Sequence, residues 1–353
     1  MDEFSRISYW TSNQQDEKLL KRNAVKVAIG DDAAIVAGAV SEDGSSKDFE
    51  LLYTVDTMVE DIHFTSTTMT YAQIGYKALA SNLSDIAAMG GVPLHALIAI
   101  SVPGHVSAQQ AKQLYDGIYE CANTFGVAIV GGDTTSSPHN LVVTITVVGQ
   151  VEAGTAILRS GAKFRDMLVI TGVAGKSAAG LHLLMHPELE QEISPELSAQ
   201  LKRAHQLPKP HLAQARLLRE SGVCHSLNDV SDGLASEAGE IALASKVDVI
   251  IEETKLPISD SLSRYAALSH CSALDWMLYG GEDYILIGTI ASQHYKELKR
   301  SFQQLGMQLY EIGYVEAGTG EVWLEGSSWQ SQHGQSPKTQ RKRIERKGYN
   351  HFT

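Results

Sequence analysis

The chain has 353 residues, a formal net charge of -12 and 43% hydrophobic residues, as expected for a globular protein of about two domains. The acidic balance argues against a nucleic-acid surface, which needs a basic stripe. No apolar run reaches the ~20 residues that cross a bilayer, and the acidic start lacks the layout of a signal peptide. The three cysteines are far apart, so we expect reduced thiols in a cytoplasmic protein.

The first half mixes strand-like and helix-like stretches. Apolar runs between turn residues predict strands, and helical spacing of apolar residues predicts helices. Ser107 is placed to cap one helix and Gly126 to end it. We expect strands at 25–29, 33–40, 51–55, 94–102, 127–130 and 141–148, and helices at 77–91 and 107–125.

The best domain boundary is the glycine-containing stretch Gln150–Lys163, which predicts domains of residues 1–150 and 151–353. Strands and helices also mix in the second half, so the predicted fold class is α/β (α+β) with two domains. We expect strands at 167–171, 247–252, 284–290 and 309–315, and helices at 177–186, 211–221, 234–244 and 293–305, with a polar helical excursion at 187–207.

The helix at 77–91 is apolar almost all round, which is typical of a buried helix. One polar stripe crosses it, because Lys77, Ser81 and Asp85 are spaced four residues apart and share a face. A carboxylate on a buried helix is costly unless it is paired. Hydroxyls and backbone N–H groups are one way to satisfy Asp85, and a bound cation is another.

Acidic residues next to glycine or at strand ends recur along the chain. Any single Gly-Asp pair is explained by a turn, but the whole set is larger than turns require. The positions are Asp31 and Asp32, Asp56, Asp133, Asp229 and Asp232, Glu282 and Asp283, with Asp85 on the helix. If they converge, cations must offset their charge. Oxygen ligands without His/Cys spacing favour Mg²⁺ or Ca²⁺ over zinc, and Mg²⁺ commonly completes its shell with water and phosphate.

Other motifs are weaker. Gly172–Ser177 resembles a Walker phosphate loop, but that motif needs a glycine where this chain has Ile170. A local anion contact from Lys176 stays open. Nucleophile motifs such as Gly-x-Ser-x-Gly are absent. His63 follows Asp56 in an acidic loop, so a substrate contact and a structural role are both open. Six of ten residues from Lys338 to Lys347 are basic, which indicates a solvated segment or a local anion contact.

Taken together, the motifs resemble the thiamine-monophosphate kinase family, from the superfamily that includes aminoimidazole ribonucleotide synthetase and selenophosphate synthetase. The matching stretches cover nearly the whole chain in order: GDDAA (30–34), TVDTMVEDIHF (54–64), YKALASNLSDIAAMGG (76–91), GGDTT (131–135), LRSGAK (158–163), NDVSDGL (228–234), GGEDY (280–284) and GYNHF (348–352). The resemblance implies a homodimer whose N-terminal domains build a shared β-barrel. It also implies that ATP and several Mg²⁺ lie between the domains, and that ATP phosphorylates thiamine monophosphate to thiamine diphosphate.

The resemblance also implies roles for individual residues. The implied metal ligands are Asp31, Thr54, the main chain of Val55, Asp56, Asp85, Asp133, Asp229 and Asp232. The implied ATP-binding residues are Tyr115, Gly132, Asp133, Arg159 and Ser231. The implied contacts to thiamine phosphate are His63, Glu282, Asp283 and an aromatic residue near the C-terminus, for which we choose Tyr349.

The chain departs from the family pattern at three positions: Val55 lacks a side-chain hydroxyl, Asn228 adds polarity beside Asp229, and Asn350 stands where aspartate is common. Two other functions remain alternatives. One is a different ATP-using enzyme of the superfamily, although selenophosphate synthetase is disfavoured because no cysteine lies in a glycine-rich N-terminal segment. The other is a non-catalytic module that binds divalent metals and needs the acidic residues but not the LRSGAK segment (158–163) or His63.

Overall fold

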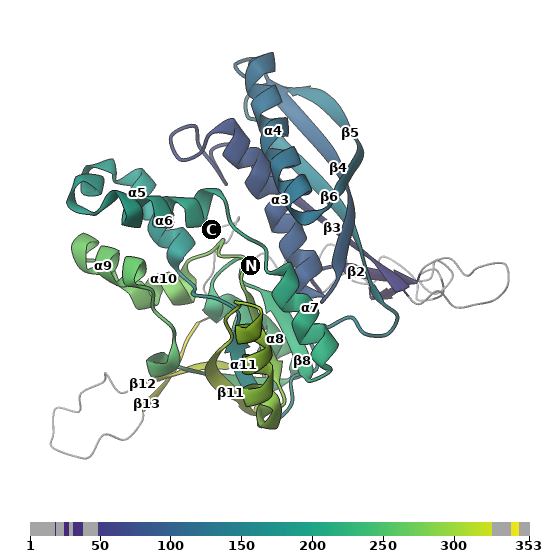
Figure 1. Cartoon of the computed structure of the whole chain (residues 1–353), viewed down its shortest axis with the longest axis vertical. Coiled ribbons are helices and arrows are strands. Elements are labelled where there is room, and N and C mark those ends of the chain that lie inside the picture. The colour runs from purple at the N-terminus through teal and green to yellow at the C-terminus, as the bar shows by residue number, and fades with distance from the viewer. Residues whose placement is uncertain (1–17, 19–24, 28–30, 38–48, 327–339, 346–353) are drawn as a thin grey trace. The chain divides into compact units, whose positions relative to one another are not determined.

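The computed structural model describes Lys18 and residues 25–27, 31–37, 49–326 and 340–345. The chain divides into two compact units that meet in sequence between Ala156 and Ile157, and each unit has its own β-sheet (Figure 1). The predicted boundary after residue 150 falls inside the strand β6. Within the described ranges, every helix is too short or too polar to cross a bilayer.

In the first unit, the described strands form one sheet in the order β1-β2-β3-β6-β4-β5. The strands are β1 (Val25–Val27), β2 (Ala34–Ala37), β3 (Phe49–Val59), β4 (Val92–Pro103), β5 (Ala128–Ser137) and β6 (Val142–Glu152). Helices α3 (Tyr71–Ala88) and α4 (Ala108–Phe125) lie side by side against the sheet (Figure 1). The sheet is open in this single chain, so the barrel shared by two chains stays a prediction.

Alternation along the strands decides which side chains the helices cover, because successive residues point to opposite faces. On the helix side of β6, Ile145 and Val147 are fully buried. On the other face, Tyr53 of β3, Val55 of β3 and Leu97 of β4 are 39%, 58% and 43% exposed. The first unit therefore has one covered face and one uncovered face that carries apolar side chains.

Two glycines allow α3 and α4 to pack closely. A Cβ atom added at Gly75 would lie 1.9 Å from the carbonyl oxygen of Leu114, and one added at Gly117 would lie 1.7 Å from that of Ala72. Any larger residue at either position would force the helices apart. The close packing holds α3 in a defined place against the sheet.

Both helices begin at a capping box, in which a side-chain oxygen and a glutamine satisfy the first N–H groups. The predicted N-cap Ser107 is confirmed, and so is the end of α4 at Gly126, whose φ of 72° is in the left-handed region. The other helix starts earlier than the predicted residue 77, because Thr70 forms the capping box with Gln73. Its extra turns place Tyr71 at the end far from Asp85.

The second unit has a sheet in the order β13-β12-β9-β11-β7-β10-β8. The strands are β7 (Met167–Ile170), β8 (Cys224–Asp229), β9 (Val247–Glu252), β10 (Leu286–Ile290), β11 (Tyr310–Ala317), β12 (Val322–Gly326) and β13 (Gln340–Arg343). The α-helices are α5 (Lys176–Met185), α6 (Pro195–Gln206), α7 (Leu212–Ser221), α8 (Leu234–Ser245), α9 (Asp260–Ser269), α10 (Ala273–Tyr279) and α11 (Tyr295–Gln304). Short 3₁₀ helices are η1 (Pro187–Glu192), η2 (Glu253–Lys255) and η3 (Ser292–His294).

The described part of the basic tail is β13, which pairs with β12. Arg341 donates hydrogen bonds to Glu325 at 2.7 Å and to Glu316 at 2.8 Å. Arg343 makes an ion pair with Glu321 at 2.5 Å. These arginines therefore bind carboxylates of the same unit, which is a structural role for this part of the tail.

Candidate active site

The first group of acidic residues lies where strand β3 runs along helix α3. Thr54 Oγ1 donates a short hydrogen bond to Asp85 Oδ2 on the helix. The main-chain N–H of Asp56 donates to Asn82 Oδ1 at 3.1 Å. These two bonds connect the predicted ligands Thr54 and Asp56 on β3 to helix α3, which carries the predicted ligand Asp85.

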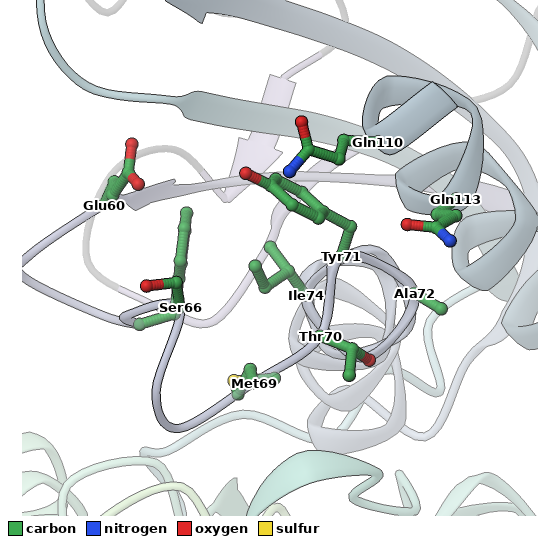
Figure 2. Close-up of a pocket in the computed structure, with 10 residues that line it drawn as sticks. Glu60, Ser66, Met69, Thr70, Tyr71, Ala72, Ile74, Gln110 and Gln113 are labelled. Carbon is green, nitrogen blue, oxygen red and sulfur yellow. The ribbon is translucent and has the colours of Figure 1, made fainter. Parts of the chain in front are cut away.

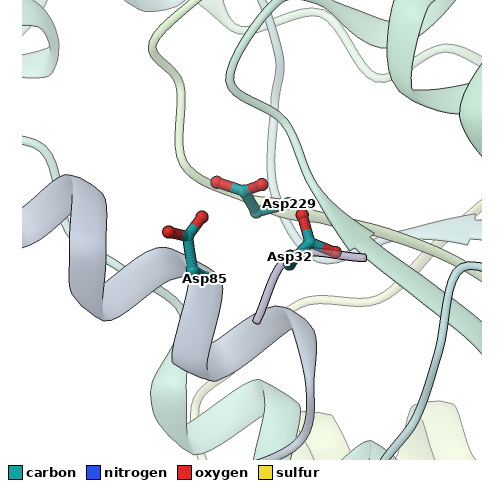
Figure 3. Close-up of side chains that lie close together, drawn as sticks. All are labelled: Asp32, Asp85 and Asp229. Carbon is teal, nitrogen blue, oxygen red and sulfur yellow. The ribbon is translucent and has the colours of Figure 1, made fainter. Parts of the chain in front are cut away.

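Asp32 belongs to this group, and its neighbour Asp31, which the family resemblance implied as a ligand, stays a prediction. Oxygen atoms of Asp32 and Asp85 lie within 4.8 Å of one another. Figure 3 draws both side chains, together with that of Asp229 from the second unit. The carboxylate of Asp31 accepts the main-chain N–H of Asp32 at 3.0 Å. Sequence alone could not separate two adjacent aspartates, because their spacing to the other acids is nearly the same.

The carboxyl group of Asp56 shows the electrostatic cost of this arrangement. Burial raises its pKa, a hydrogen bond from Ser81 partly offsets that rise, and the charge of Asp32 raises it further. Asp32 acts on Asp56 and also lies within 4.8 Å of Asp85 by its nearest ligand atoms, and acids this close repel when they are ionised. An oxygen-only donor set of this kind fits a hard divalent cation such as Mg²⁺. Asp32, Asp56 and Asp85 are the first-unit residues that would hold it.

The remaining metal and nucleotide candidates of the first unit lie on β3, α4 and β5. The side chain of Val55 points to the uncovered face, which leaves only its main chain for ligation. Tyr115 is half-buried on α4. Gly132 and Asp133 were expected in a loop but belong to β5, which pairs in parallel with β4. Gly132 cannot carry a side chain, because a Cβ atom would lie 1.9 Å from the carbonyl oxygen of Ile98.

His63 lies in the loop that follows β3. Its Nδ1 accepts the main-chain N–H of Val59 at 2.9 Å, so the neutral ring carries its proton on Nε2. A bond of this kind fixes the orientation of the imidazole ring. His63 can therefore present an N–H donor in a defined direction.

A cavity of about 560 Å³ adjoins this loop at the N-terminal ends of α3 and α4 (Figure 2). Glu60, Tyr71 and Gln110 supply polar groups to its lining, and Phe64 and Ile74 supply apolar ones. Burial raises the pKa of Tyr71, and the charge of Glu60 raises it further. Asp85 is 14 residues along α3 from Tyr71, or ~21 Å, so the cavity is separate from the aspartates.

In the second unit, Asp229 ends β8, and Ser231 and Asp232 follow in the loop before α8. Arg159 Nε donates to Asn228 Oδ1 at 3.2 Å. Glu237, which the sequence did not single out, contacts Asn228, Ser231 and Asp232. In the sequence, Glu237 is marked only by its position four residues after the glycine of the SDGL turn. A glutamate at that spacing is too common to indicate a functional residue.

Asp283, for which the resemblance implied a substrate contact, faces main-chain N–H groups of its own unit. It is buried, and its carboxylate accepts the main-chain N–H of Ser177 at 3.0 Å and that of Gly175. Burial raises its pKa to about 6, while these N–H donors and Lys176 act in the opposite direction. Asp283 thus occupies the amides of the Walker-like loop, which removes the donors that a phosphate would need there.

Glu282, next to Asp283, sits at a φ of 67°, which is a strained backbone conformation for a residue with a side chain. Its Oε2 lies 3.4 Å from Nδ1 of the buried His205. Glu282 remains a candidate for the substrate contact. Tyr349 lies outside the described residues.

The two-unit fold and its acidic loops define the class of protein. Residues 30–151 match the family described as AIR synthase related protein, N-terminal domain, and residues 166–324 match AIR synthase related protein, C-terminal domain. The predicted two-domain mixed α/β fold of this superfamily is thereby confirmed.

Relatives then identify the particular family. Thiamine-monophosphate kinase of Bacillus subtilis is 39% identical over 352 residues, with 100% of both chains covered. The structure of AaThiL complexed with AMPPCP and TMP superposes with a TM-score of 0.77 at 28% identity, covering 99% of this chain and 97% of that one. The crystal structure of thiamine-monophosphate kinase from Stenotrophomonas maltophilia superposes with a TM-score of 0.72 at 32% identity, covering 87% of this chain and 93% of that one. The chain belongs to the thiamine-monophosphate kinase family, as the motifs indicated.

Proposed function

We infer that this protein transfers a phosphoryl group from ATP to thiamine monophosphate, giving ADP and thiamine diphosphate. The 39% identity to the B. subtilis kinase over the whole chain carries this conclusion. The complex of the related AaThiL with AMPPCP and TMP supports the same pair of substrates. The group of acids on β3 and α3 agrees with phosphate chemistry, which depends on charge neutralisation.

Mg²⁺ is the cation that this donor set suits best. Asp32, Asp56 and Asp85 would hold it in the first unit, and Asp229 and Asp232 are the candidate ligands in the second. When bound, the metal would neutralise charge on the phosphate oxygens and orient them. The rigid α3 helix holds Asp85 in place, which limits the reorganisation needed when a metal binds.

The transfer is proposed to be direct and in line, without a phosphoenzyme. The attacking group is a phosphate monoester, whose second pKa of about 6 leaves it largely ionised at neutral pH. It therefore needs no strong general base, which agrees with the lack of a nucleophile motif in the sequence. The protein's part is positioning: Arg159 and Ser231 would bind the nucleotide, and His63 and Glu282 would bind thiamine phosphate.

The active form is proposed to be a homodimer in the cytoplasm. The uncovered face of the first sheet carries Tyr53, Val55 and Leu97, and the edge strand β5 exposes Val130 by 58%. An apolar sheet face of this kind favours association with a second surface, and a second copy offers the matching face. Light scattering at micromolar concentration should give twice the chain mass, and a monomer would overturn the proposal.

The direct test is ADP production with Mg²⁺, ATP and a panel of phosphorylated acceptors. We expect thiamine monophosphate to be the preferred acceptor and Asp85→Asn to abolish the reaction. Asp116→Asn serves as a matched control, since Asp116 is an exposed acid on α4 that pairs only with Lys112 among the ion pairs described. Preference for another acceptor would favour a different enzyme of the superfamily. No ADP with any acceptor would favour a non-catalytic metal-binding module.

A further inference from the structure

A single buried carboxylate organises the acidic loop of the second unit. Glu237 on α8 is 3% exposed. Its Oε2 accepts the side-chain N–H of Asn228 at 2.6 Å, and its Oε1 accepts the hydroxyl of Ser231 at 3.3 Å and the main-chain N–H of Asp232 at 3.1 Å. Asn228 lies on β8, and Ser231 and Asp232 lie on the loop after it, the segment to which the proposed function assigns metal and nucleotide ligands.

The contacts continue beyond Glu237. Asn228 is fully buried, and its side-chain oxygen accepts the Nε–H of Arg159 at 3.2 Å. Chemistry fixes the direction of both bonds, because a guanidinium can only donate and an ionised carboxylate can only accept. Asn228 must therefore turn its oxygen to Arg159 and its amino group to Glu237.

We propose that Glu237 is a positioning residue that couples the nucleotide ligands Arg159 and Ser231 to the metal ligand Asp232. The inference rests on the proposed function, since it assumes that these residues bind MgATP. Through Asn228 the orientation of Arg159 depends on the carboxylate at position 237. Through its other oxygen the same carboxylate fixes the loop that carries Asp232. Nucleotide binding and metal binding therefore share one buried support.

Glu237→Gln tests this coupling with little change of shape. The new amide can still accept bonds from Ser231 and Asp232, but its amino group then faces the amino group of Asn228. If Asn228 rotates its amide to relieve the clash, its amino group faces the Nε–H of Arg159. One of the two contacts is lost in either orientation. Partners of this kind behind metal ligands typically change affinity or activity by ~10–100-fold, which is the loss in kcat/KM that we expect.

The expected signature is a joint rise in KM for ATP and in the Mg²⁺ concentration at half-maximal rate. A merely structural role would instead lower kcat and Tm and leave both concentration dependences unchanged. Exchanging the pair, as Asn228→Asp with Glu237→Gln, should rescue much of the loss. The carboxylate at position 228 could then accept bonds from both Arg159 and the amide at position 237. Glu220→Gln, an exposed change on α7 where Glu220 pairs with Arg216, is the control and should match wild type.

Equilibrium binding of a non-hydrolysable ATP analogue with Mg²⁺ gives a readout that does not depend on turnover. Weaker analogue binding by Glu237→Gln, restored in the exchanged pair, supports the proposal. Wild-type values for Glu237→Gln, or an exchanged pair no better than the single variant, would overturn it. Failure of the proposed function is distinguishable, because wild-type protein would then bind the analogue but release no ADP with thiamine monophosphate.

Discussion

Asp56 in the first unit and Asp248 in the second are partly buried acids with opposite surroundings. In the first unit, Asp56 lies near the charge of Asp32, and its pKa is raised. In the second unit, burial also acts against Asp248, but its carboxylate accepts N–H groups from Thr319, Gly320, Glu321 and the indole of Trp323. These donors outweigh burial and leave the pKa of Asp248 below its usual value.

The comparison separates structural acids from acids that need a cation. N–H donors satisfy a carboxylate from within the protein, so Asp248 is stable in its ionised form. Asp32 lies close to Asp85 and its charge acts on Asp56, so the ionised forms of these acids repel unless positive charge enters the site. Removing an acid that is satisfied by N–H donors should therefore lower stability. Removing an acid that needs a cation should lower activity.

The largest expected effect is on activity at Asp85. Asp85→Asn keeps an oxygen that can accept the Thr54 hydroxyl but removes the charge that would bind metal. We expect kcat/KM to fall by more than the ~10–100-fold typical of outer-shell partners, with the thermal midpoint unchanged or raised. Steady-state kinetics at saturating Mg²⁺ and a melting curve measure both. Near-normal turnover would show that the first group of acids is structural after all.

Asp283 should show the opposite pattern. Asp283→Ala leaves the N–H groups of Gly175 and Ser177 without their acceptor, and each buried unsatisfied donor costs about 1–3 kcal/mol. Urea denaturation near pH 4, where ionisation of Asp283 costs little, should reveal a loss of roughly that size per donor. If stability stays at the wild-type value while KM for thiamine monophosphate rises, Asp283 is the substrate contact that the resemblance implied.

Asp56 makes a smaller, pH-dependent contribution. Its pKa is raised in the folded protein, so the folded state binds its proton more tightly than the unfolded state does. Stability from this group is present below the ordinary pKa of 3.8 and is lost as pH rises through the raised value. In metal-free protein at neutral pH, Asp56→Asn should raise Tm by about 2–4 °C, the shift produced by ~1 kcal/mol in a domain of ordinary size.

Added Mg²⁺ sharpens the test of Asp56. The metal should raise the Tm of wild-type protein more than that of Asp56→Asn, because it offsets the repulsion that the variant has already removed. The stability that protonated Asp283 contributes to the fold is also lost as pH rises from 3.8 to about 6. This loss is the same in wild type and in Asp56→Asn. A steeper pH dependence in the variant than in wild type would contradict the assignment.

The smallest expected effect is a change in stability at Arg341, in the part of the basic tail that forms β13. The side chain of Arg341 is 37% exposed in its ion pair with Glu316, and such pairs contribute only about 0.2–1 kcal/mol. Arg341→Ala should lower stability by no more than that, less at high salt, with unchanged kinetics. A clear rise in KM for either substrate would instead give the tail a role in anion binding.

Local sequence was enough to predict much of the fold and part of the site. The Ser107 cap and the Gly126 end of α4 depend on chemistry within one turn, so they could be read directly. The motifs around Asp56 and Asp85 indicated the family, which the relatives confirm. The strand through Gly132 was missed because pairing with β4, not local propensity, makes it a strand.

Sequence determined which residue types are available for phosphate and metal chemistry, and in what order. Only the tertiary structure decided which acids face one another and which are satisfied by N–H donors. An oxygen of Asp32 lies within 4.8 Å of one of Asp85, adjacent Asp31 accepts the main-chain N–H of Asp32, and Asp283 is turned into a helix N-terminus. Glu237 became visible only through its contacts. The physical reason is that a carboxylate's role depends on the donors and charges within a few ångströms, and these come from residues distant in sequence.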